Sequence, residues 1–196
     1  MNMKKVIAWI LILMIAMMAA GACAEEADPF FAQMEGMEWT FCSGVGAWST
    51  DMWIFPDGSF AGEFHDSDLG DAGEEYPMGT VYYCKFSGRM SLVEQVDENT
   101  WKIRVEEVTE EGSREPEMIE DGVRYIYAAP YGVSAGDEML LYRPGTPVNG
   151  FTDDMQMWAH LHDDPEKTVD ALETWFLYSV SNESGFVGNP AENGIL

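Results

Sequence analysis

Residues 48–64, WSTDMWIFPDGSFAGEF, decide the fold class of this chain. Apolar and polar residues alternate from Trp48 to Phe55 and again from Ser59 to Asp66. Alternation with a period of two is the pattern of a strand with one buried face. Between the two runs stands Pro56-Asp57-Gly58, a tight-turn sequence. The stretch therefore predicts a β-hairpin.

The same pattern continues on both sides of this hairpin. Residues 109–121 are charged and predict a long exposed loop. We expect further strands over residues 39–43, 80–86, 90–96, 100–108, 123–127 and 138–143, with a bend or bulge at Ser87-Gly88. Many short strands with short connections predict a mostly β fold, a small antiparallel barrel or sandwich of about eight strands.

The period changes in the carboxy-terminal part of the chain. Phe151, Met155, Trp158 and His162 recur at helical spacing, and Asp164-Pro165-Glu166 is typical of a second helix start. We therefore expect a helical segment over about residues 151–176, with one or two short helices. An alternative interpretation makes residues 175–181 a closing strand.

The amino terminus has the pattern of a secretion signal. Lys4 and Lys5 precede the apolar run of residues 6–20, and small residues follow. We expect a signal peptide over residues 1–24, a linker over 25–35 and a single domain over 36–196. Two alternatives stay open: lipid attachment at Cys23, as in bacterial lipoproteins, and an uncleaved helix. All three place the domain outside the cytoplasm, secreted or at the cell surface, with the membrane touched only through the signal or a lipid.

The charge of the chain is strongly negative. Without Lys4 and Lys5, the formal charge of −25 becomes −27. Such a surface repels nucleic acid and anionic lipid headgroups, because both carry phosphate. It keeps a protein soluble, and we expect a monomer. Cationic partners and divalent metals fit the charge.

Cysteines offer two interpretations. Once Cys23 is removed, Cys42 and Cys84 form an even pair in an exported protein, which permits a disulfide. Two buried free thiols are the alternative.

Gly36-Met37-Glu38-Trp39, at the start of the first strand, resembles the Gly-x-Trp motif of lipocalins with one residue inserted. The lipocalin-like (calycin) resemblance covers about residues 36–146 and implies a ligand-carrying β-barrel. The stretch from Phe41-Cys42-Ser43-Gly44 to residues 76–80, YPMGT, is also similar to uncharacterised exported proteins of Gram-positive bacteria. That second resemblance implies no activity.

The loop over residues 66–75 contains five carboxylates, with glycines at positions 70 and 73 between them. Carboxylate oxygens are suitable ligands for calcium, which prefers six to eight oxygen ligands. The spacing does not match an EF-hand, so any Ca²⁺ site here has another geometry. A solvated loop without a metal is the alternative interpretation. The expected metal ligands are Asp66, Asp68, Asp71, Glu74 and Glu75.

Aromatic residues complete the set of candidate sites. A barrel of about eight strands either fills its interior or holds one small ligand there. We expect a non-catalytic binding module with an aromatic-lined interior for a small apolar ligand. The alternative is a cell-surface interaction protein whose acidic loops bind calcium or a cationic partner. No catalytic residue is expected, because no nucleophile or acid–base pair stands in a supporting context. The expected ligand-binding residues are Trp39, Trp48, Trp53, Phe60, Phe64, Tyr83, Trp101 and Tyr125.

Overall fold

The structure is a computed structural model that describes residues 27–111, 117–164, 166 and 168–191. The expected signal peptide over residues 1–24, with the alternative lipid site Cys23, lies outside the described residues. Within the described part of the chain, no helix has the length and the apolar character needed to cross a membrane.

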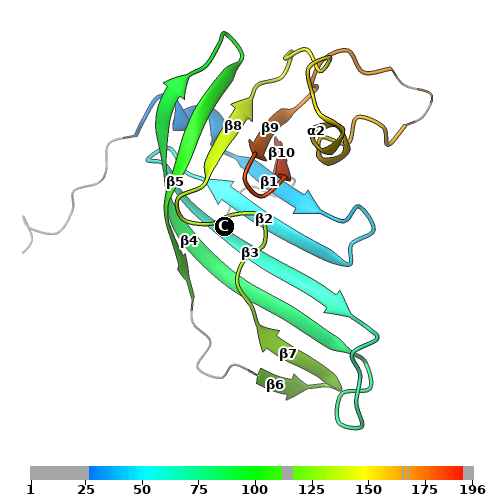
Figure 1. The fold of residues 1–196 in the computed structure, drawn as a ribbon. Helices are drawn as coiled ribbons and strands as arrows, with labels where there is room; N and C mark the ends of the chain where they lie inside the picture. Colours follow the sequence, from blue (N-terminus) through cyan, green and yellow to red (C-terminus); the bar gives the residue numbers. More distant parts are fainter. Residues whose placement is uncertain (1–26, 112–116, 165, 167, 192–196) are drawn as a thin grey trace, which may run out of the picture.

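Eight antiparallel strands close into a β-barrel (Figure 1). Each strand pairs with the next along the barrel, and β10 returns to pair with β1. The predicted mostly β antiparallel barrel is confirmed. Its strands are β1 (Met37–Cys42), β2 (Trp48–Ile54), β3 (Ser59–Asp68), β4 (Thr80–Gln95), β5 (Thr100–Glu110), β8 (Glu138–Tyr142), β9 (Trp175–Ser179) and β10 (Ser184–Pro190).

Strand β4 is long enough for its two halves to pair with different strands. Its residues 86–95 pair with β5, while residues 80–83 pair in parallel with β7 (Val123–Tyr127). Strand β6 (Glu117–Glu120) pairs with β7 and ends the sheet. The loop expected over 109–121 is therefore partly strand, since it holds the end of β5 and all of β6; its residues 112–116 lie outside the described chain.

Both ends of the barrel are covered by other segments. At one end, the short 3-10 helix η1 (Phe31–Met34) buries Phe31 and Met34, and Phe30 packs on Trp101 with ring centroids 5.8 Å apart. The linker expected over residues 25–35 is thus partly core. At the other end, the Tyr131 carbonyl accepts a hydrogen bond of 2.8 Å from Thr50 Oγ1, and Val133 is buried.

The tail contains one described helix, α2 (Asp153–Trp158), which Thr152 caps by accepting the Met155 amide. The expected second helix does not form among the described residues of 164–176; β9 begins at Trp175, as the closing-strand alternative had it. Strand β9 is buried on both faces: Leu177 belongs to the barrel core, while Phe176 and Tyr178 pack under the tail. A strand covered on both faces is continuously apolar, so periodicity alone does not separate it from a helix.

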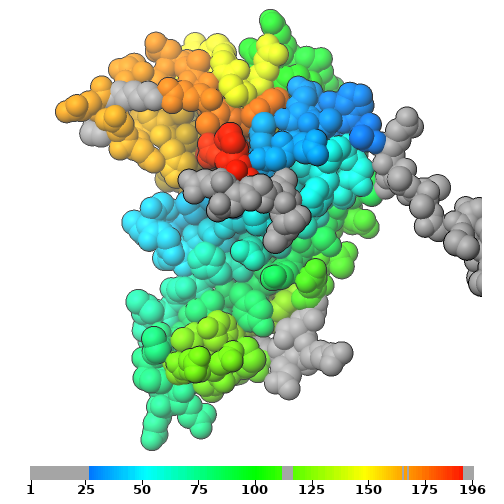
Figure 2. All heavy atoms as spheres, turned by 180° about the vertical axis from the view of Figure 1, so that it is seen from behind, coloured from blue at the N-terminus to red at the C-terminus, as the bar shows by residue number. Residues whose placement is uncertain are grey.

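The tail lies at one end of the molecule and the β6–β7 hairpin lies at the other, with the barrel between them (Figure 1). Figure 2 shows this from behind, with the tail in yellow to orange and the hairpin in green. The space beside the tail, where α2 meets the β1–β2 turn, holds the candidate site described below.

Candidate functional site

The barrel interior is filled by side chains. Trp39 has 0% of its surface exposed and Phe60 has 1%. A side chain with no surface reachable by water borders no space that even a water molecule occupies. Trp39 and Phe60, both expected ligand residues, therefore belong to the packed core. The other interior residues include Phe41, Met52, Ile54, Phe86, Ile103, Val105, Met139, Leu141, Leu177 and Phe186.

The remaining aromatic residues of the expected site do not converge. Trp53 lies on the outer face of β2, between the inward residues Met52 and Ile54. Tyr83 and Tyr125 also face outward and pack on each other, with ring centroids 6.1 Å apart. Phe64 is buried on the inner face of β3, and Trp101 lies at the end covered by η1. Of the expected ligand residues, Trp48 lines an open hollow.

That hollow, here called the rim groove, has a volume of about 700 Å³ and lies between the β1–β2 turn and the end of α2. Its apolar wall includes Val45 and Met157, which are 89% and 51% exposed. Exposed apolar side chains grouped around a concave surface are typical of binding sites. The groove is lined by Cys42, Ser43, Gly44, Val45, Trp48, Met157, Trp158, His160 and Asp163.

A cluster of aromatic rings supports the rim groove from below. Phe41, which is buried, packs edge-on against both Trp48 and Trp158, with ring centroids 4.8 and 4.7 Å apart. Trp48 and Trp158 are 6.2 Å apart, and Tyr131 lies 5.3 Å from Trp48. Edge-to-face packing of this kind fixes ring orientation. The two tryptophans of the groove are therefore held in place before any ligand arrives.

Polar groups stand at the edge of the rim groove. His160 Nδ1 lies 3.0 Å from Asp163 Oδ2. Ser43 Oγ is buried and has no hydrogen-bond partner among the described residues. A buried hydroxyl without a partner costs stability.

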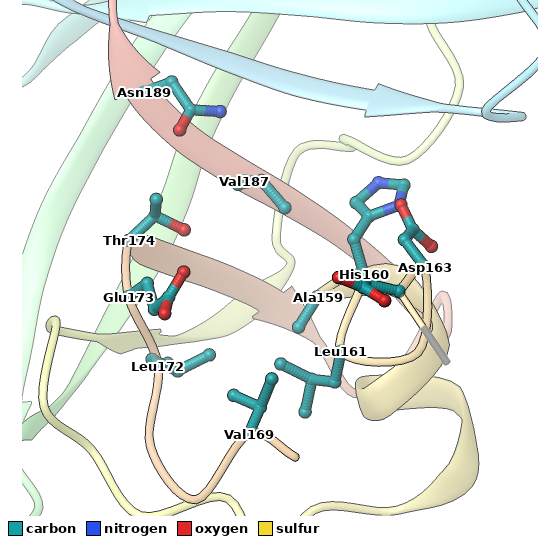
Figure 3. Close-up of a pocket in the computed structure, with 11 residues that line it drawn as sticks. Ala159, His160, Leu161, Asp163, Val169, Leu172, Glu173, Thr174, Val187 and Asn189 are labelled. Atoms are coloured by element: carbon teal, nitrogen blue, oxygen red, sulfur yellow. The ribbon is translucent and has the colours of Figure 1, made fainter. Parts of the chain in front are cut away.

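His160 and Asp163 also line a second hollow of about 410 Å³, which lies between the tail and β10. Figure 3 shows the His160 ring and the Asp163 carboxylate side by side at its edge, with Leu161, Val169 and Leu172 gathered below. These two polar residues therefore form the wall shared by both hollows.

His160 has an unusual backbone conformation, with φ of 55°. It ends α2 in a Schellman motif, in which the Leu161 amide donates to the Gln156 carbonyl and the His160 amide donates to the Met157 carbonyl. Glycine usually occupies this position, because a Cβ is strained there.

Replacing His160 with glycine is expected to stabilise the protein by about 0.5–1 kcal/mol, since the relief of left-handed strain exceeds the added freedom of the unfolded chain. The melting temperature should rise by about 1–4 °C. His162→Gly is the matched control: His162 does not share the positive φ, so the same replacement should lower the melting temperature. Shifts of the same sign in both variants contradict the strain at His160.

The acidic loop is held by contacts within the protein. Asp68 Oδ1 accepts the amides of Gly70 and Asp71 at 2.8 and 3.1 Å. The Asp71 carboxylate forms an ion pair with Arg124, whose guanidinium lies 4.3 Å from the centre of the Tyr76 ring. Asp71 is thus already neutralised.

Of the other expected metal ligands, Asp66 is half-buried on β3, and Glu74 and Glu75 are exposed. In residues 27–111, 117–164, 166 and 168–191, no three His, Cys, Asp or Glu side chains are grouped to hold a metal ion. The calcium site stays a prediction.

Cys42 and Cys84 are both free, as in the interpretation without a disulfide. They lie on β1 and β4, with β2 and β3 between them. Cys84 points into the barrel beside Phe86, whereas Cys42 lies on the opposite face from the inward Phe41. Burial raises the pKa of the Cys84 thiol to about 11, which disfavours the reactive thiolate.

A hydrogen-bonded chain on the outer face of the sheet was not expected from the sequence. Asp51 accepts the hydroxyls of Thr40 and Ser49 at 2.8 and 2.6 Å, and Ser49 Oγ lies 3.2 Å from His65 Nδ1. Ser, His and Asp are the residue types of hydrolytic triads, but the order differs, because Ser49 gives its only proton to Asp51 rather than to His65. The chain joins β1, β2 and β3 as a structural network. Alternation along β2, which places Ser49 and Asp51 on one face, is the signal that identifies it.

The rim groove was also missed, apart from Trp48. Val45 and Met157 are far apart in the sequence and meet only because the tail returns to the β1–β2 turn. No local pattern carries that information. Comparison with known proteins found no matching family model, no similar curated sequence and no similar solved structure.

Proposed function

We propose that this protein is a non-catalytic binding module of the extracytoplasmic space, which takes a small, largely apolar ligand in the rim groove. The observation that carries the proposal is the groove itself, about 700 Å³ in volume and walled by Trp48 and Trp158. This volume falls within the range of small-molecule sites, about 300–1,000 Å³. The amino-terminal pattern of Lys4, Lys5 and the following apolar run supports the location.

The closed barrel supports this proposal as a scaffold. Lipocalin-like barrels hold their ligands inside, but here core side chains occupy that space. A rigid barrel with a groove at its rim still provides a preformed site, and a preformed site loses little conformational entropy on binding. The module is therefore lipocalin-like in shape, with its ligand moved from the interior to the rim.

The test uses N-phenyl-1-naphthylamine, an uncharged apolar dye whose fluorescence rises in apolar sites. We expect it to bind the wild-type protein, and the double variant Val45→Ser, Met157→Ser to bind it about tenfold more weakly, because two apolar contacts are lost. Both side chains are exposed, so the fold should be retained.

The matched control is Met118→Ser, Ile119→Ser, which removes a similar exposed pair from β6, outside the groove. This control should keep the wild-type affinity. Absence of dye binding, or equal weakening in both double variants, contradicts the proposed function.

A further inference from the structure

We propose that the ligand of the rim groove is a small organic cation, an alkylated ammonium, recognised by Trp48, Trp158 and Asp163. This inference rests on the proposed function and names the chemical class of ligand. Three observations support it: the aromatic walls, the charges around the groove and the polar groups at its edge.

The aromatic walls suit a cation. Trp48 and Trp158 are both half-buried and both line the groove, with their planes at 63° to each other. Tyr131 packs against Trp48 with ring centroids 5.3 Å apart and supports the position of that wall. A cation over the face of an aromatic ring is attracted by its negative face, most strongly by tryptophan, and grouped rings are the usual receptors of alkylated ammonium ions.

The charges around the groove have one sign. Of the described residues that line it, none is lysine or arginine, and Asp163 supplies a carboxylate. The whole chain carries a formal charge of −25. A negative field of this kind concentrates cations and repels anions. A ligand with a carboxylate or phosphate is therefore disfavoured.

The polar residues at the edge of the groove indicate where the charged group of a ligand would bind. His160 Nδ1 contacts Asp163 Oδ2, which orients the carboxylate and leaves Oδ1 for a ligand. A ligand with an apolar body and a cationic head matches this combination.

The test compares choline with 3,3-dimethylbutan-1-ol, in which carbon replaces the charged nitrogen. The two molecules have the same shape, so the difference in their affinities measures the effect of charge. Titration followed by tryptophan fluorescence, with displacement of the naphthylamine dye as a second readout, should show choline binding about tenfold more tightly. Binding of choline should weaken at high salt, because the attraction is electrostatic.

Asp163→Asn should weaken choline binding about threefold, a modest effect because the carboxylate is mostly exposed, and should leave the neutral alcohol unchanged. Glu74→Gln, which removes one exposed charge from the acidic loop, is the control and should change neither. If choline and the alcohol bind with equal affinity, the inference that the ligand is a cation is wrong. Dye binding would in that case still support the rim groove as a binding site. Binding of neither probe, together with no dye binding, overturns both proposals.

Discussion

Replacing Gly88 with alanine is expected to destabilise the protein by about 3 kcal/mol. A Cβ at this position would lie 2.1 Å from the Glu107 carbonyl oxygen and 2.4 Å from the Phe60 ring. The first contact is with backbone, so the strand itself must move. Because the β4–β5 pairing shifts register next to Gly88, that movement would disturb the bulge that bends the barrel.

Gly88 is one half of a repeated arrangement. Phe60 on β3 stands opposite Gly88 on β4, and Gly62 on β3 stands opposite Phe86 on β4. A Cβ at Gly62 would lie 2.5 Å from the Phe86 ring, so each ring covers the glycine across from it. Aromatic rings over cross-strand glycines are a known device for bending a sheet without leaving a void. The pair therefore explains how two interior phenylalanines fit beside a tightly curved wall.

The measurement is urea unfolding, followed by circular dichroism. Gly150→Ala is the matched control, because no atom other than those of its own residue and its two chain neighbours lies within 4 Å of the added Cβ, and its φ is not positive. It should change the unfolding free energy by less than about 0.5 kcal/mol. If Gly88→Ala is as stable as Gly150→Ala, the close approach of β4 to Phe60 and β5 is wrong.

Strands were predicted best where one face of the strand is buried and the other faces solvent. Residues 48–54 and 59–68 form the expected hairpin, because alternation and the Pro56-Asp57-Gly58 turn agree. Strand β10 was not expected at all. Its sequence, SGFVGNP, has glycines where strands usually carry branched residues, and those glycines accommodate rings: a Cβ at Gly188 would lie 3.0 Å from Trp39.

About eight strands were expected, but they are not the eight of the barrel, since residues 80–86 and 90–96 belong to the single strand β4. Residues 123–127 form β7, which pairs in parallel outside the barrel, and β9 and β10 bring the barrel to eight strands. Pairing partners depend on contacts between distant segments, which periodicity does not encode. The same reason explains the candidate site: the sequence identified Trp48 as a candidate ligand residue but not its partners Trp158 and Tyr131, which come from the tail and from the β7–β8 connection.

Removing the Trp39 side chain has the largest expected effect of any single truncation. Trp39→Ala should destabilise the protein by about 3–5 kcal/mol, because a large cavity opens in a core with no space to spare. Trp53→Ala is the matched control. Trp53 is half-buried on the outer face of the neighbouring strand, so its loss should cost only about 1–2 kcal/mol in the same urea experiment. Equal losses would contradict the assignment of the two tryptophans to opposite faces.

A milder replacement at the same position separates the core from the binding site. Trp39 Nε1 has no hydrogen-bond partner among the described residues, so Trp39→Phe removes ring volume without breaking a bond, and the protein should remain folded. Because Trp39 does not line the rim groove, this variant should bind the naphthylamine dye with wild-type affinity although it is less stable. A changed dye affinity in a folded Trp39→Phe protein would instead mean that the ligand enters the barrel, since only there does position 39 contact it.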